Sequence, residues 1–187
     1  MKVFAILLIA GLPFVQRLTR ETNSHAATAR GVKQFAAKKY AEAQKSFATS
    51  SSIDPTPARS FNLGTSQIAA GNREAGSSTI AKALTDPALR ADALFNRGNS
   101  ALAASAFDYA IRDYSDTLRL RPSDTAAKRN LEIALRRKQA MQKQQGGVQQ
   151  PKSDPNVEGL LRSVQQQEQE ELARMHRPSR ERVHVGW

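Results

Sequence analysis

The chain has 187 residues, no cysteine and a formal net charge of +11. This length suits one modest domain with flanking segments, and the lack of cysteine excludes disulfides, thiol nucleophiles and cysteine-based zinc sites. The basic balance favours anionic partners such as nucleic acid, an acidic protein surface or an anionic membrane.

An apolar run opens the chain. Lys2 precedes Val3–Val15, and a basic residue followed by such a run is typical of a secretory signal. The run is shorter than the roughly 20 residues of a membrane-spanning helix. Arg17 and Arg20, just beyond it, weaken the charge asymmetry that orients an anchor. We expect residues 1–25 to be a signal peptide or membrane anchor that places the protein at the cell envelope, exported or anchored, with the periplasmic side favoured.

Three stretches then share one spacing. Glycines recur 33 and 34 residues apart, followed after 12 residues by a small residue and after 16 by a bulky one. Pro55 and Pro122 follow at a common distance, and Pro87 comes one residue early. This order, with a period near 34, is typical of tetratricopeptide (TPR) repeats, in which stacked helical hairpins form a solenoid. A generic helical bundle with coincidental spacing is the alternative.

We therefore expect an all-α fold, with a TPR domain of three repeats and a capping helix over residues 26–144. The first helix of each repeat carries the glycine, and the second opens at Tyr40, Arg73 or Phe107. The middle repeat is expected to be the least stable, because glycine replaces alanine in its second helix at a cost of about 1 kcal/mol. The residues expected to pack the repeats are Gly31, Tyr40, Ala43, Phe47, Gly64, Gly76, Ile80, Gly98, Phe107, Ala110 and Tyr114.

The end of the chain divides into further segments. A capping helix is predicted from about Thr125 to Lys143, with Ser123 or Asp124 as its N-cap. Residues 145–156 read as a disordered linker, residues 157–176 as a separate amphipathic helix and residues 177–187 as a disordered tail. The helix is a candidate ligand for a partner or for the chain's own TPR groove. Its narrow apolar stripe consists of Leu161, Val164, Leu172 and Met175.

The second half of the chain resembles the TPR proteins of bacterial aerotolerance (Bat) operons. The resemblance rests on Ala93–Ser100, Asn130–Leu135, the segment Gly159–Glu168 and the terminal Trp187. It implies an envelope-associated adaptor that works with von Willebrand A-type membrane proteins and MoxR-type ATPases in envelope stress or oxygen tolerance. The tail departs from the family, because no acidic residue directly precedes Trp187.

No residue pattern indicates an enzyme. The sequence contains no Ser–His–acid set or phosphate-cradling glycine loop, and His25, His176 and His184 lack metal-ligand spacing. We therefore expect no cofactor, metal or small-molecule substrate. The leading hypothesis is a scaffold whose concave face, built from the first helices, binds a protein partner. The candidate contact residues are Asn62, Gln67, Asn96 and Asn99, although Asn96 and Asn99 could instead satisfy contacts between repeats.

Two other binding functions stay open. A co-chaperone that clamps an acidic peptide C-terminus would need Lys or Arg at positions where this chain has Thr28, Val32, Asp92 and Asn96, beside a matching Asn62. A nucleic-acid or anionic-membrane binder would use the basic charge, but the basic tail lacks interleaved aromatic residues for base stacking. Nucleic acid is the less favoured partner.

Overall fold

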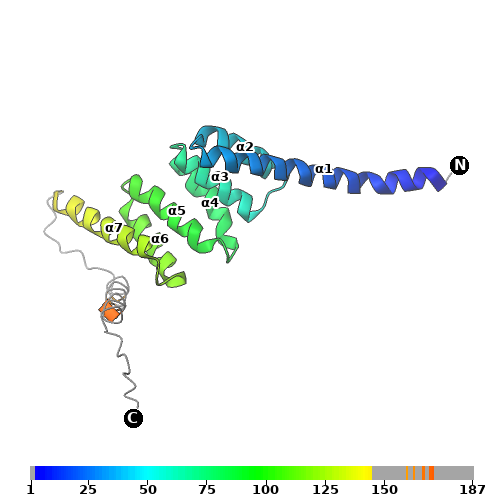
Figure 1. The fold of residues 1–187 in the computed structure, drawn as a ribbon. Coiled ribbons are helices and arrows are strands. Elements are labelled where there is room, and N and C mark those ends of the chain that lie inside the picture. The colour runs from blue at the N-terminus through cyan, green and yellow to red at the C-terminus, as the bar shows by residue number, and fades with distance from the viewer. Residues whose placement is uncertain (1–2, 145–158, 160–161, 163–165, 167–168, 171–187) are drawn as a thin grey trace, which may run out of the picture.

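A computed structural model describes residues 3–144 together with residues 159, 162, 166, 169 and 170. Residues 3–144 are helical with short turns, and the helices stack into a right-to-left array in Figure 1. The elements are α1 (Val3–Ala36), α2 (Tyr40–Ile53), α3 (Pro57–Ala69), α4 (Arg73–Ala81), the 3-10 turn η1 (Lys82–Thr85), α5 (Arg90–Ala103), α6 (Phe107–Leu120) and α7 (Thr125–Gln144).

The array is built from three helical hairpins, α1–α2, α3–α4 and α5–α6, followed by α7. The second helices begin at Tyr40, Arg73 and Phe107, which confirms the predicted starts. Two residues before each of these starts, the turn inside the hairpin takes a positive φ: 60° at Lys38, 93° at Gly71 and 58° at Ser105. The left-handed turn thus recurs in all three repeats, and only the middle one uses the residue that adopts it without strain.

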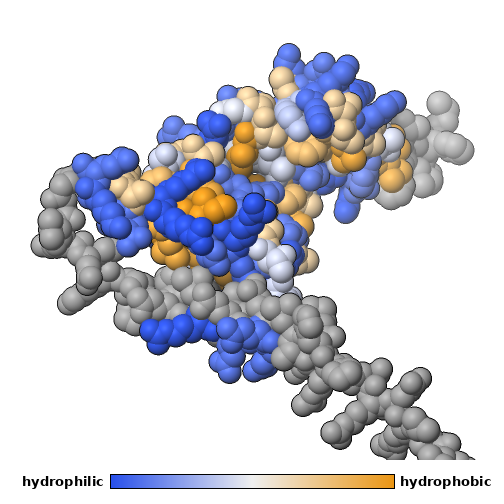
Figure 2. All heavy atoms as spheres, turned by 60° about the vertical axis from the view of Figure 1, so that its left-hand side comes forward, coloured by the Kyte–Doolittle hydropathy of each residue, from blue (hydrophilic) through white to orange (hydrophobic). Residues whose placement is uncertain are grey.

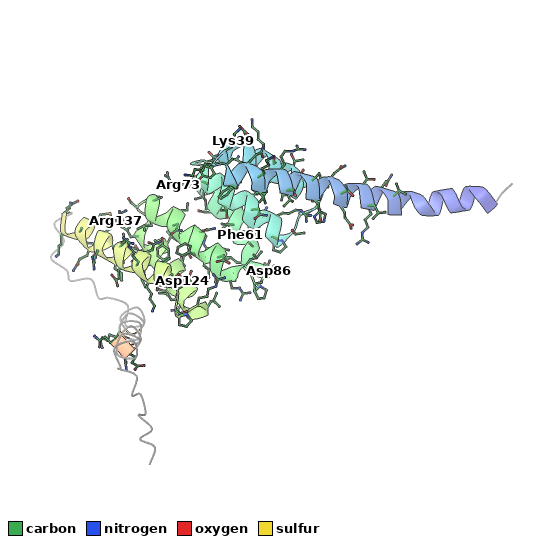
Figure 3. All side chains as sticks on the ribbon, viewed as in Figure 1. Lys39, Phe61, Arg73, Asp86, Asp124 and Arg137 are labelled. Carbon is green, nitrogen blue, oxygen red and sulfur yellow. The ribbon has the colours of Figure 1, made fainter. Side chains whose placement is uncertain are left out.

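The turns lie along two opposite edges of the array. Figure 3 places Lys39 and Arg73, which follow the turns inside hairpins, along one edge. It places Asp86 and Asp124, which belong to the connections between hairpins, along the other. The edge at Lys39 and Arg73 is also the one where α7 ends, because α7 runs in the same direction as the first helices of the hairpins (Figure 1).

The repeat glycines mark close helix crossings in the first and third hairpins. A Cβ added at Gly31 would lie 2.7 Å from the Phe47 ring, and one at Gly98 would lie 2.9 Å from the Tyr114 ring. Phe47 and Tyr114 are buried, so each glycine makes room for the aromatic residue of its own hairpin. This confirms the predicted role of the spacing.

The middle hairpin is closed differently. A Cβ at Gly76 would lie 2.8 Å from the carbonyl oxygen of Gly64 and 2.9 Å from the backbone nitrogen of Ile68. The backbones of α3 and α4 therefore approach closely at two facing glycines, a role of Gly76 that the argument from helix propensity did not include. The helix α4 has 9 residues, against 14 in α2 and α6, and passes directly into the 3-10 turn η1.

The largest apolar cluster joins α6 to α7. It comprises buried residues on both helices: Ala110, Ile111, Tyr114, Leu118, Ala127, Leu131 and Ala134. Asp124 is the N-cap of α7, because its Oδ1 accepts a hydrogen bond of 2.9 Å from the Ala127 amide. The predicted capping helix is therefore present, and it covers the end of the third hairpin.

The first helix continues well beyond the hairpin that it forms with α2 (Figure 1). Contacts to α2 include Ser24, which is fully buried, whereas Val15 and Leu18 are exposed by 59% and 47%. Within the described part of the chain, no helix is both long and apolar enough to span a membrane.

Candidate protein-interaction surface

The first helices of successive repeats lie side by side and are joined by a ladder of polar side chains. Asn96 Nδ2 on α5 donates to Thr65 Oγ1 on α3 at 3.2 Å. Asn130 Nδ2 on α7 donates to Asn99 Oδ1 on α5 at 2.9 Å. The two bonds occupy equivalent positions, because donors and acceptors are each spaced by one repeat of 34 residues.

The ladder has one open step. Asn62 precedes Asn96 by one repeat, and the residue opposite it should be Val32, one repeat before Thr65. Valine has no acceptor, and Asn62, although half-buried, makes no hydrogen bond within the described residues. Val32 itself is 53% exposed. We call Val32, Asn62, Thr65, Asn96, Asn99 and Asn130 the first-helix face.

The four predicted contact residues thus differ in their environments. Asn62 is available on the first-helix face, and Asn96 is engaged with Thr65. Asn99 accepts a second hydrogen bond, 2.8 Å from Tyr114 Oη, so it links three helices. The hydrogen bonds of Asn96 and Asn99 therefore join neighbouring repeats, as the alternative interpretation expected. Gln67 lies elsewhere, in the groove described below.

The positions that a carboxylate clamp would use carry no free cation. Thr28 Oγ1 donates to the Ser24 carbonyl at 3.0 Å, and Asp92 is held by both terminal nitrogens of Arg121 at 2.5 and 2.8 Å. The hydrogen bond from Arg121 lowers the pKa of Asp92, with partial burial opposing it. Asp92 is therefore a fixed negative charge where a clamp would need a positive one.

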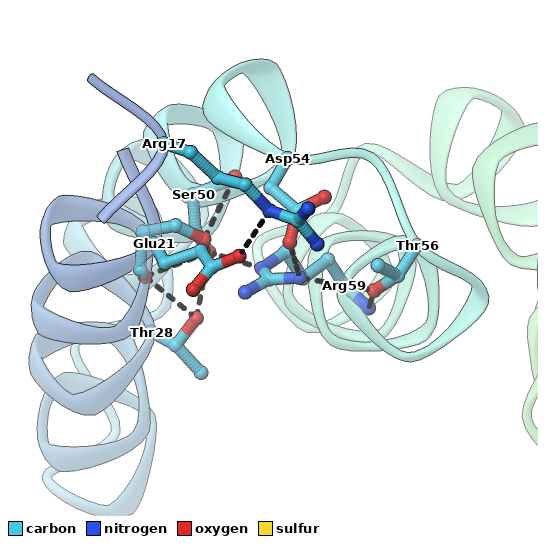
Figure 4. Close-up of polar contacts among 8 residues, drawn as sticks. Arg17, Glu21, Thr28, Ser50, Asp54, Thr56 and Arg59 are labelled. Carbon is cyan, nitrogen blue, oxygen red and sulfur yellow. Dashed lines mark hydrogen bonds and ion pairs between the residues drawn. The ribbon is translucent and has the colours of Figure 1, made fainter. Parts of the chain in front are cut away.

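Hydroxyl groups join the first hairpin to the second. Ser50 is fully buried, and its Oγ lies 2.6 Å from Thr28 Oγ1 and 3.0 Å from the Ser24 carbonyl oxygen (Figure 4). Arg59 Nε donates to the same Oγ at 3.0 Å, and Arg59 Nη1 contacts Asp54 at 2.6 Å. Sequence reasoning missed this polar joint, because buried hydroxyls leave no apolar periodicity.

A groove of about 950 Å³ lies between the second and third hairpins. Its walls include Arg73 and Ser77 on α4 and Tyr109 on α6, and the side-chain oxygen of Gln67 is buried there without a hydrogen-bond partner among the described residues. An ion pair of 2.6 Å between Arg97 and Asp113 borders it. The groove lies beside the small residues of α4. These residues are visible in the sequence at Gly71–Ser78, but the repeat register alone did not predict a cavity there.

The outer face of α7 is basic. Arg129, Ile133, Arg136, Arg137 and Ala140 recur at helical spacing on the side opposite the buried Ala127, Leu131 and Ala134. We call these five residues the α7 outer face. In Figure 2, which brings the α7 end of the array forward, hydrophilic residues surround a small apolar area. Arg136 pairs with Glu132 at 3.5 Å, whereas Arg129 and Arg137 have no acidic partner among the described residues.

The remaining candidates fall outside this geometry. Leu161, Val164, Leu172 and Met175 lie outside the described residues. The described residues contain no cluster of three or more His, Asp or Glu side chains that could hold a metal.

Comparison with known proteins gives structural matches only. No protein-family model and no curated protein sequence matches the chain. The first TPR domain of Spaghetti (RPAP3), bound to the HSP90 peptide SRMEEVD, is 22% identical with a TM-score of 0.57 over 64% of this chain and 94% of that one. The Arabidopsis OM64 TPR domain is 14% identical with a TM-score of 0.59 over 63% and 98%.

The fold is that of a TPR domain. The crystal structure of MamA matches over a longer stretch, with 15% identity, a TM-score of 0.64 and 81% of each chain covered. These likenesses confirm the predicted TPR solenoid of helical hairpins. At such identities the likenesses show the fold alone. They do not show what the first-helix face binds.

Proposed function

We propose that the protein is a non-enzymatic adaptor whose first-helix face binds an extended segment of a partner protein. The observation that carries the proposal is the open step of the asparagine ladder. Asn62 offers an amide that can both donate to and accept from a peptide backbone. The repeat register pairs it with Val32, which is exposed, and the other asparagines of this face are already bonded. A half-buried amide without a partner is costly unless a ligand or water satisfies it.

Two variants test this proposal. Asn62→Ala removes the free amide, and Val32→Thr restores the acceptor that the other steps possess. Both should weaken partner binding by about tenfold, the effect of one hydrogen bond of about 1.4 kcal/mol. Val32→Thr should leave the array folded, because residue 32 is exposed. Unchanged binding in both variants would exclude Asn62 as a contact.

The partner class that we propose is a von Willebrand A-type membrane protein at a bacterial cell envelope, reached through export or anchoring by residues 1–25. The support is the sequence resemblance to Bat-operon TPR proteins over Ala93–Trp187. The test is affinity capture from detergent-solubilised native membranes at moderate salt with the full chain as bait. Recovery of a von Willebrand A-type protein by the wild type, reduced for Asn62→Ala, is the expected result. Recovery of ribosomal material or nucleic acid alone would contradict it.

The co-chaperone function is less well supported. The structurally similar Spaghetti domain was solved with the acidic peptide SRMEEVD. Here Asp92 would repel the peptide carboxylates, and its partner Arg121 is already committed to it. We expect no saturable binding of SRMEEVD to the full chain at physiological salt. Binding with a dissociation constant in the micromolar range would revive this function.

A further inference from the structure

The net positive charge of this protein lies in residues 1–144. These residues contain 22 Lys and Arg against 11 Asp and Glu, whereas residues 145–187 contain six of each. Within that last part the basic tail is preceded by an acidic stretch, because residues 158–175 carry four glutamates and two arginines. The chain therefore combines a basic array with an acidic segment that follows it.

The α7 outer face is the part of the array best suited to that segment. Its arginines at positions 129, 136 and 137 surround Ile133 and Ala140, so it combines a narrow apolar strip with positive charge on both sides. Every earlier helix of the stack is followed by another helix that packs against it, whereas α7 is the last in residues 3–144. The α7 outer face is therefore the polar outer face of a capping helix, and no other helix of residues 3–144 covers it.

We propose that residues 158–175 of the same chain dock on the α7 outer face as an antiparallel amphipathic segment. Leu161, Val164, Leu172 and Met175 would supply the apolar contacts to Ile133 and Ala140. Glu168 and Glu171, which share that side of a helix, would face the arginines of α7, whereas Glu170 lies on the opposite side and is exposed. The contact itself does not depend on the proposed function. Its consequence does rest on that function, because the docked segment would border the first-helix face at Asn130 and compete with a partner.

The lengths agree with this arrangement. The α7 stretch from Arg129 to Gln144 measures about 22 Å at 1.5 Å per residue. A segment of 18 residues would measure about 27 Å as a helix. The intervening residues 145–157 need only reverse the chain, and a flexible linker of this length has a root-mean-square span of about 20 Å. Such a linker holds the segment at a millimolar effective concentration, so weak contacts suffice.

The charge arrangement predicts a salt dependence. The Debye length falls from about 10 Å at 0.1 M salt to about 3 Å at 1 M. Exposed arginines and glutamates across the contact would therefore lose most of their attraction as salt rises, while the apolar strip would keep part of it. Docking should weaken with salt without being abolished.

The experiment measures one intrachain distance in the full chain. The chain has no cysteine, so Gln139→Cys and Gln166→Cys, both at exposed positions, can carry the only two spin labels. Double electron–electron resonance should give a narrow distribution at short distance, because packed helices lie about 8–10 Å apart. The combined substitutions R129E, R136E and R137E should broaden the distance distribution at least about twofold, toward that of a flexible tether.

The controls separate docking from net charge and from misfolding. Reversing three exposed lysines on other elements, Lys33, Lys45 and Lys82, changes the net charge equally and should leave the distribution narrow. Adding E168K and E171K to the arginine substitutions should narrow the distribution again. A broad distribution in the wild type, or equal effects of both reversals, would overturn the proposal.

A second copy is the competing occupant, and it would also overturn the proposal as stated. It would produce the short distance in mixtures of singly labelled chains, with a signal that grows with concentration. The intrachain contact is independent of concentration. If the first-helix face bound no partner, this measurement would be unaffected, so the two proposals fail separately.

Discussion

Replacing Gly76 with alanine distinguishes two accounts of the middle repeat. Helix propensity alone favours the alanine by about 1 kcal/mol. In the structure, the new Cβ would lie 2.6 Å from Ile68 Cγ1, 2.8 Å from the Gly64 carbonyl oxygen and 2.9 Å from the Ile68 nitrogen. The side chain of Ile68 can rotate away, but the two backbone atoms can move only if α3 and α4 separate.

The expected balance is a net loss of stability. Overpacking of a tight contact costs about 1–3 kcal/mol, and the two backbone contacts put Gly76→Ala at the upper end. After the gain in propensity, we expect a loss of about 2 kcal/mol, which corresponds to about 5–10 °C in midpoint temperature for an array of this size. Urea denaturation followed by circular dichroism measures it. The matched control is Ser78→Ala, on the exposed side of α4, which should change stability by less than about 0.5 kcal/mol. A variant Gly76→Ala that is more stable than the wild type would refute the close approach of the two backbones.

Three further predictions concern the ion pairs and the buried tyrosine. The Asp113 side chain is only 4% exposed, and Asp113→Ala leaves its partner Arg97 unpaired. We expect the free energy of unfolding, measured by urea denaturation, to fall by about 2–3 kcal/mol, and to fall less in the double variant with Arg97→Met. The lowered pKa of Asp92 means that its pair with Arg121 stabilises the fold above about pH 4 and is lost as pH falls through the folded-state pKa. Because this pair is nearly half exposed, Asp92→Asn should remove at most about 1 kcal/mol at pH 7 and less as the pH is lowered below about 4, and a loss that does not diminish with falling pH would contradict the ion-pair account. Burial raises the pKa of Tyr114 above the accessible range, so stability should fall as pH rises above about 10, and absorbance at 295 nm should show this tyrosine ionising only together with unfolding; ionisation in the folded state would contradict its burial.

The repeat register was readable from the sequence because it depends on a few residue types with fixed steric roles. The spacing predicted the starts of α2, α4 and α6 to the residue, and Pro55 and Pro122 each follow two residues after the end of a second helix. The asparagines at 62, 96 and 130 were also visible at a spacing of 34. What they do depends on the residue opposite each one, and that pairing appears only when the first helices are placed side by side.

Other features were out of reach for physical reasons. A glycine can lower helix propensity or allow a close crossing, and only the position of α3 decides which applies at Gly76. The groove at Arg73 and Ser77 arises from what the small residues of α4 fail to fill. The hydroxyl joint at Ser50 depends on hydrogen bonds between residues 26 positions apart in sequence, for which the chain offers no periodic signal.

Because of the hydroxyl joint at Ser50, different kinds of interaction hold the helices together at the two ends of the array. At one end, α1, α2 and α3 meet through serine, threonine and arginine contacts, whereas α6 and α7 meet through a continuous apolar cluster. In a linear array, each unit opens with a free energy set by its own stability and that of its nearest neighbours. Amide hydrogens of α1 and α2 should therefore exchange with deuterium through a partial opening that leaves α5–α7 protected. The molecule would melt from its amino-terminal hairpin, along a gradient of protection factors, and the helices that carry the asparagine ladder toward α7 would be the last to open.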